Sequence, residues 1–166
     1  MDSIPQQLLL QVILILINAF FAMTEIAVIS LTPGRLRMLA EEGDKAAPKL
    51  LKLVEEPAGF LSTIQIAITL AGFLSSAFAA DSFAGYLVDW VYTDLGFQSL
   101  SRGTLNTLSV IVITLILSYF TLVLGELTPK RIAMQKPLQV AKLSCGVVMA
   151  VAAAARPAVW LLSAST

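Results

Sequence analysis

The chain has 166 residues, of which 57% are hydrophobic and 13% are charged. Soluble domains carry about twice that share of charge, so the composition is typical of an integral membrane protein. The 11 basic and 11 acidic residues balance, so the chain lacks the excess positive charge of a nucleic-acid-binding protein. It has no histidine, which excludes histidine-based metal sites. Cys145 is the only cysteine, so an internal disulfide is excluded. Any metal handled by this chain is expected to be a hard cation bound by oxygen atoms.

Three apolar stretches cover residues 8–31, 58–80 and 104–126. Each reaches the ~20 residues that a helix needs to cross about 30 Å of hydrocarbon. The first is not expected to be a cleaved signal peptide, because it is too long and no basic segment precedes it. The sequence therefore predicts an all-α membrane protein with three transmembrane helices.

The basic residues are distributed unevenly between the connecting segments. Five lie in loop 32–57 and five follow residue 126, whereas loop 81–103 has only Arg102. The positive-inside rule therefore places the first loop and the C-terminal tail in the cytoplasm, and the N-terminus and second loop outside.

The first loop is predicted to form a helical hairpin over residues 33–56. Thr32 can cap its first helix, Gly43 can end that helix, and Asp44 can cap the second. A solvated charged loop is the alternative.

The second loop is rich in aromatic residues, which predict a belt at the outer interface: Phe83, Tyr86, Trp90, Tyr92 and Phe97. The segment 138–165 is predicted to be a juxtamembrane helix along the inner face, because its apolar run is short for a span and stops at Arg156. A fourth span is the competing interpretation.

Each predicted span has one face of polar and small residues. The stripes with helical spacing are Ser62, Gln65, Thr69, Gly72 and Ser76 in the second span, and Thr107, Thr114, Ser118, Thr121 and Gly125 in the third. In the first span, Asn18 and Glu25 share a face. Such faces suit a wet cavity or a partner helix, and Gly72, Ser76 and Ala80 form a candidate dimer or packing face.

The carboxylates favour a cation site. Glu25 lies about 9 Å inside the first span, Glu126 ends the third span, and Gln65 lies in the same half of the second. Carboxylates at membrane depth are costly and usually functional. No Lys or Arg lies inside a predicted span, and Lys130 is the nearest candidate partner of Glu126 in sequence. An interfacial Glu126–Lys130 helix pair and a protonated Glu25 are the alternatives.

Pro129 adds a backbone argument, because its ring would clash with the carbonyl of Gly125 in a regular helix. The third span is therefore expected to kink or bulge at Glu126. A carbonyl freed in this way, beside a carboxylate, is a ligand pair for a hard cation.

Three segments resemble the membrane domain of the CorC/hemolysin-C/CNNM family: NAFFAMTEIAVIS (18–30), FLSTIQIAITLAGFLSSAF (60–78) and LVLGELTPKRIAMQKP (122–137). The Gly-Glu-x-x-Pro-Lys signature of the last segment is the most specific feature, together with STIQI in the second. The resemblance covers nearly the whole chain, although residues 81–103 and 138–166 match only loosely.

The resemblance implies a homodimer in the cytoplasmic membrane, with three transmembrane helices, a cytoplasmic helical hairpin and a juxtamembrane belt helix in each protomer. It implies export of Mg²⁺ or a related divalent cation, with Na⁺ as a candidate coupling ion. Family members continue into a cytosolic CBS pair that binds adenine nucleotide. This chain is therefore expected to be a membrane domain separated from that pair and without nucleotide regulation.

Carried over onto this sequence, the resemblance makes Thr24, Glu25, Gly125 and Glu126 the cation ligands, with Thr69 or Gln65 substituting on the second helix. A flexible gate or kink is expected at Gly125, Pro129 and Lys130. The chain has Ala22 and Ile68 where family members tend to have Ser and Asn, so two oxygen ligands are missing.

The leading hypothesis is therefore a Mg²⁺ exporter. An exporter of polyamines or other organic cations is the first alternative, because carboxylates suit those cations equally. A non-transporting membrane anchor for cytosolic domains is the second. An enzyme is not expected, since the sequence shows no nucleophile–base pair.

Overall fold

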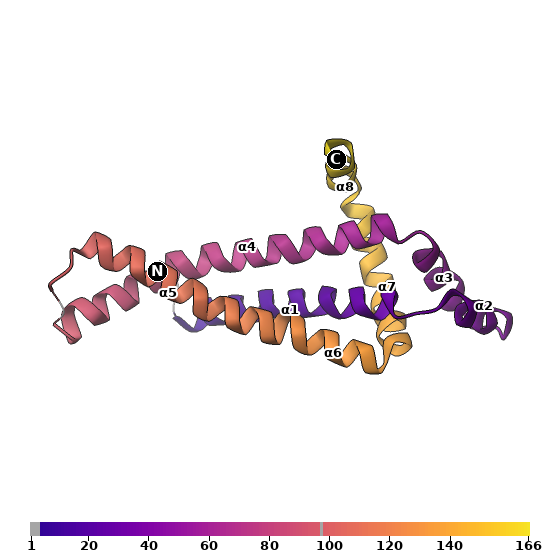
Figure 1. Cartoon of the computed structure of the whole chain (residues 1–166), viewed down its shortest axis with the longest axis horizontal. Coiled ribbons are helices and arrows are strands. Elements are labelled where there is room, and N and C mark those ends of the chain that lie inside the picture. Colours follow the sequence, from indigo (N-terminus) through magenta and orange to yellow (C-terminus); the bar gives the residue numbers. More distant parts are fainter. Residues whose placement is uncertain (1–3, 97) are drawn as a thin grey trace.

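The computed structural model describes residues 4–96 and 98–166, and the described residues form helices and no strand. Three long helices lie side by side (Figure 1): α1 (Ile4–Ile29), α4 (Pro57–Asp89) and α5 (Arg102–Leu122). A π-helical turn, η2 (Val123–Leu127), joins α5 to α6 (Thr128–Gln135), so that α5, η2 and α6 form one continuous rod. The all-helical prediction holds for the described residues.

Large apolar side chains lie exposed along the three long helices, as in a bundle that faces lipid or a partner. Phe73 on α4 and Leu115 on α5 are 70% and 66% exposed. Helix α4 continues past residue 80, where the predicted second span ends, and reaches about 50 Å at 1.5 Å per residue. A span needs only about 30 Å, so α4 is longer than a membrane crossing requires.

The C-terminal end of α4 and the turn that follows it carry four of the five predicted belt residues. The helix passes into a second π-helical turn, η1 (Trp90–Asp94), and both Tyr86 and Trp90 are half exposed. Arg102, at the start of α5, bonds the Asp89 carboxylate at 2.8 Å and lies 5.0 Å from the centre of the Tyr92 ring. These two contacts link the start of α5 to the end of α4 and to η1. The predicted belt residue Phe97 lies outside the described residues.

The short helices α2 (Pro33–Glu41) and α3 (Ala47–Glu55) pack against each other as the predicted hairpin, and Arg37 bonds Glu55 across them at 2.9 Å. Asp44 lies three residues before α3 and its Oδ1 accepts the backbone N–H groups of Ala46 and Ala47, so it bonds the start of α3 although Ala46 occupies the cap position. Thr32 occupies the cap position of α2 as predicted, but its side chain makes no capping hydrogen bond. Pro33 already removes one of the unpaired donors there.

Helix α7 (Pro137–Ala154) crosses the hairpin end of the bundle, and α8 (Arg156–Ser165) leads away from it (Figure 1). Four described helical segments are long and apolar enough to span a membrane, and α7 is one of them. Its crosswise direction is nevertheless the one expected of a belt helix, since it runs across the ends of α1 and α4. The three-span topology therefore stays a prediction, with this direction in its favour.

The hydrophobic core lies at this same end. It joins the last turns of α1, the hairpin, the first turns of α4, and α6 with α7, and its fully buried members include Val28, Leu36, Leu50, Ile64 and Val148. Lys142 of α7 also forms an ion pair with Asp44 of the hairpin. The Lys142 hydrogen bond, reinforced by the capped N–H groups, lowers the pKa of Asp44 below its ordinary value of 3.8. The hairpin is thus fastened to α7 by packing and by charge.

Candidate functional site

The π-helical turn η2 lies where the sequence predicted a kink and ends two residues before Pro129. A π turn carries one extra residue in the helix and therefore shifts the hydrogen bonds that Pro129 would have disturbed. The carbonyl of Gly125 accepts a hydrogen bond of 2.9 Å from the side-chain amide of Asn18 on α1. Both residues are buried, so this contact holds η2 directly against the first helix.

The close approach of the two helices favours glycine at position 125. A Cβ added there would lie 3.0 Å from Nδ2 of Asn18, which is closer than real Cβ contacts normally come. The carbonyl that was expected to be free for a cation therefore already has an amide partner in this structure. A carbonyl oxygen has two lone pairs, so the contact does not remove Gly125 as a ligand candidate.

Lys130 lies between the two predicted carboxylates. Its Nζ is 3.0 Å from Oε1 of Glu126, one helical turn back, and 3.6 Å from Oε2 of Glu25 on α1. The three side chains are each between 23% and 35% exposed. The structure thus brings Glu25 and Glu126 together around one ammonium group, and it includes the Glu126–Lys130 helix pair that was the alternative interpretation of Glu126.

A groove of about 440 Å³ separates α4 from α5 beside this cluster. Its polar and small lining residues come from the two predicted stripes, from Ser75 beside the second-helix stripe and from η2: Thr69, Gly72, Ser75, Ser76, Ser118, Thr121 and Glu126. Glu126 supplies the only carboxylate of this lining. Parts of the second-helix and third-helix stripes therefore face the same groove, as a wet cavity between the helices would require.

The other predicted ligands lie apart from the groove lining. Thr24 is completely buried, and its hydroxyl donates to the carbonyl of Phe20 within α1 at 2.8 Å. Gln65 is exposed on α4, where its amide donates to the Thr69 hydroxyl at 3.3 Å. Ala22 is also fully buried, and Ile68 contributes an apolar side chain to the groove itself. Among the described residues, no group of three or more acidic, cysteine or histidine side chains is close enough to hold a metal.

Sequence reasoning missed a second polar contact between α1 and α4. The Gln11 amide donates to the Ser75 carbonyl at 3.1 Å, and the Ser75 hydroxyl donates back to Oε1 of Gln11 at 2.5 Å. Gln11 was an available signal, because it is a polar residue in the middle of an apolar run. Ser75 was not, since it lies one position away from the predicted stripe.

Long apolar helices, a polar groove between two of them and buried interhelical hydrogen bonds define a multi-pass helical membrane protein. The family model of the cyclin M transmembrane N-terminal domain, CNNM, matches residues 9–166, and the chain belongs to this family. The predicted family resemblance is thereby confirmed.

Several relatives match nearly the whole chain. A UPF0053 protein of Synechocystis sp. is 36% identical over 99% of this chain, and UPF0053 protein YhdP of Bacillus subtilis is 31% identical over 95%. A protein of Haemophilus influenzae named polyamine export protein is 29% identical over 90%. The matches cover 36%, 35% and 33% of those proteins, so this chain spans about a third of their length.

Proposed function

We propose that this chain is the cation-binding membrane domain of an exporter, and that Mg²⁺ is its substrate. The observation that carries the proposal is the position of Glu126, which lines the groove between α4 and α5 while sharing Lys130 with Glu25. Two carboxylates and one ammonium leave a net charge of −1 beside a polar groove. A divalent cation that enters the groove is attracted by this charge.

In the proposed cycle, Lys130 acts as a tethered counter-ion. An arriving cation displaces the Lys130 ammonium from Glu126, and the ammonium returns when the cation leaves. The carboxylates are therefore never left unpaired at membrane depth, where an isolated charge is costly. Mg²⁺ would be held by Glu126 with hydroxyls such as Thr69 and Thr121 and with retained waters, because Mg²⁺ dehydrates reluctantly.

The missing oxygen ligands at Ala22 and Ile68 favour this partly hydrated binding over a complete protein cage.

The proposal also includes a homodimer in the cytoplasmic membrane, an outer N-terminus, a cytoplasmic C-terminus and possible exchange against Na⁺. In longer proteins of the family, a cytosolic CBS pair would follow and regulate the site. The proposal contains no enzymatic step.

An organic polycation is a second candidate substrate, and one contact favours it. Glu25 and Glu126 already bind a primary ammonium, that of Lys130, and a polyamine carries the same group. A protein named polyamine export protein is among the relatives. Tyr119 and Phe120, which pack edge to face at 5.6 Å, are candidates for a cation–π contact with such a substrate. The anchor hypothesis requires that neither class of cation is bound or moved.

Flux measurements in reconstituted liposomes test the proposal and separate the two substrates. Wild type should move Mg²⁺, Glu126→Gln should abolish that movement, and excess spermidine should not compete. Glu41→Gln, an exposed carboxylate on the hairpin, is the matched control and should transport normally. Spermidine transport with no Mg²⁺ movement would instead support the polyamine assignment, and Mg²⁺ flux unchanged in Glu126→Gln would refute the role of that residue.

A further inference from the structure

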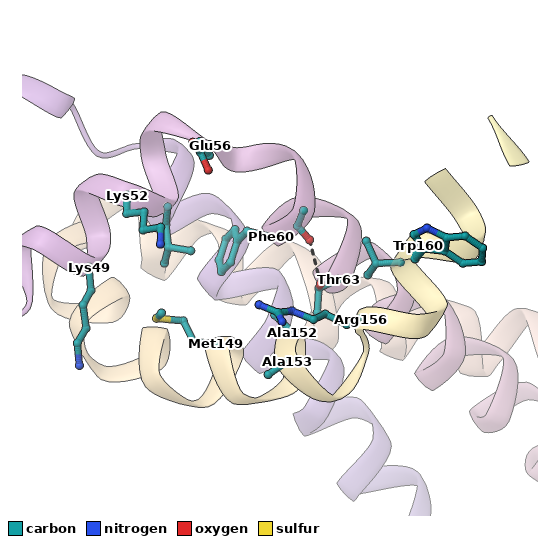
Figure 2. Close-up of a pocket in the computed structure, with 13 residues that line it drawn as sticks. Lys49, Lys52, Glu56, Phe60, Thr63, Met149, Ala152, Ala153, Arg156 and Trp160 are labelled. Atoms are coloured by element: carbon teal, nitrogen blue, oxygen red, sulfur yellow. Dashed lines mark hydrogen bonds between the residues drawn. The ribbon is translucent and has the colours of Figure 1, made fainter. Parts of the chain in front are cut away.

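A second groove, also of about 440 Å³, lies at the hairpin end of the molecule and shares no residue with the groove at Glu126. It is formed by four helices, with walls from α3, the first turns of α4, the end of α7 and the start of α8. Figure 2 shows Phe60 and Thr63 of α4 on one side and Met149, Ala152 and Ala153 of α7 on the other. The groove therefore lies where α4 leaves the hairpin and enters the bundle.

The groove has an unbalanced positive charge. Its lining includes Lys49, Lys52 and Arg156, against the single carboxylate of Glu56. Within residues 4–96 and 98–166, no ion pair involves any of these four side chains. Figure 2 shows the Arg156 side chain lying across the groove and Lys52 beside Phe60, with Lys49 at the rim. Basic side chains from separate helices, Lys52 of α3 and Arg156 of α8, thus line the same groove, and both are exposed to solvent.

The remaining lining is largely apolar. Phe60 is buried at the base, and Met149 and Trp160 extend the apolar surface along α7 and α8. Trp160 is 71% exposed, at a position where the amphipathic indole ring is typical of a membrane–water interface. A ligand that fits this hollow must carry both an anionic group and an apolar part.

We propose that this groove binds the headgroup phosphate of an anionic phospholipid of the cytoplasmic leaflet. Lys52 and Arg156 bind the phosphate oxygens, and an acyl chain lies along Phe60, Met149 and Trp160. Soluble phosphate compounds share the anionic group, but they leave this apolar surface without a partner. The positive-inside pattern places the same end of the bundle at the leaflet that is rich in anionic lipid. The inference stands apart from the cation site, because it uses none of its residues.

Native mass spectrometry of the chain released from nanodiscs tests the proposal. The nanodiscs contain equal amounts of phosphatidylglycerol and phosphatidylcholine, and retained lipid is counted for wild type and for the double variant Lys52→Gln/Arg156→Gln. Wild type is expected to retain phosphatidylglycerol preferentially. The double variant should lose that preference by about tenfold or more, since each basic side chain near an anionic surface contributes substantially to lipid binding.

The control variant is Lys45→Gln/Lys136→Gln, which removes two exposed positive charges outside the groove lining. It should keep the wild-type preference. Equal loss in both double variants would show a diffuse surface-charge effect and would overturn the proposal, as would unchanged retention in Lys52→Gln/Arg156→Gln. If glycerol 3-phosphate added to the nanodiscs displaces the lipid at millimolar concentration, the groove is a site for soluble phosphate compounds and the lipid assignment is wrong.

Discussion

At the level of single residues, Lys130 gives the two carboxylates Glu25 and Glu126 a shared counter-ion. The sequence places Glu25 and Glu126 in separate helices and gives no sign that one ammonium serves both. The structure shows that Lys130 reaches back one turn to Glu126 and across to Glu25. A carboxylate pair that carries its own counter-ion can lie at membrane depth without a bound metal.

Removing the counter-ion should strengthen cation binding. In Lys130→Gln, Mg²⁺ no longer has to displace the Lys130 ammonium from Glu126. A hydrogen bond to a charged group is worth about 1.5–3 kcal/mol, so the Mg²⁺ dissociation constant is expected to fall by about 10- to 100-fold. Calorimetric titration of the purified chain measures the change. Arg131→Gln removes an exposed neighbouring cation with no ion pair among the described residues and should leave the affinity unchanged. Weaker binding in Lys130→Gln would show that the lysine positions the carboxylates instead of competing for them.

Gly125 is the second residue on which the site geometry depends. Gly125→Ala should lower the free energy of unfolding by about 1–3 kcal/mol, because the new methyl group overlaps Nδ2 of Asn18 and forces α1 away from η2. Thermal unfolding in detergent measures the loss. Gly85→Ala, where a Cβ meets nothing within 4 Å, is the matched control and should not destabilise the protein. Equal stability of the two variants would contradict the close packing at Gly125.

At the scale of elements, the sequence predicted most of what local chemistry determines. The apolar lengths located the three long helices, Asp44 gave the start of α3, and Pro129 gave the irregular turn η2. The sequence did not predict which residues of different helices contact each other. The spacing of polar residues along one helix does not determine how the neighbouring helix is rotated about its axis. Thus Asn18 was placed on the correct face but without its partner Gly125, and Ser75 was overlooked. The C-terminal end of α4 was missed because the apolar run ends near residue 80 while the helix continues to Asp89.

The ion pair between the hairpin and α7 should make hairpin docking depend on pH. The pKa of Asp44 is lowered in the folded protein, so its stabilising effect is complete above the ordinary value of 3.8 and is lost as the pH falls through the lower, folded value. Asp44→Asn keeps an acceptor for the backbone cap but removes the charge. Hydrogen exchange of α3 should therefore be faster in Asp44→Asn than in wild type at pH 6. The difference should shrink as the pH falls below 3.8 toward the lowered pKa of Asp44, and a difference that stays constant over that range would contradict the ion-pair explanation.

At the level of the whole molecule, the membrane topology depends on whether α7 lies along the membrane surface or spans it. If α7 is a belt helix, the hairpin and α8 lie on the same side of the membrane, whereas a fourth span puts them on opposite sides. Single cysteines at Lys45, Asp94 and Ser165 are to be treated with a membrane-impermeant thiol reagent in intact cells. Only Asp94→Cys should react, and the other two should react after permeabilisation. Labelling of Ser165→Cys in intact cells would establish the fourth span. Cys145 is buried and should contribute little background.

One helix, α4, connects the two grooves. The Glu126 groove opens between the long helices, and the basic groove lies where the hairpin, α7 and α8 meet. Helix α4 lines both, since Thr69 and Ser76 face the first groove and Phe60 and Thr63 face the second. A lipid bound at one end of α4 would therefore contact the same rigid helix that forms a wall of the proposed cation site.

A calorimetric titration of wild type and Glu126→Gln with Mg²⁺, Na⁺ and spermidine tests the proposed cation site most directly. Saturable Mg²⁺ binding is expected in wild type and should be lost in Glu126→Gln, while Glu41→Gln binds normally. Binding of spermidine alone would change the substrate and keep the site. If no cation binds to wild type, Glu126 serves only to hold Lys130 and the end of the helix, and the cation-site account is contradicted.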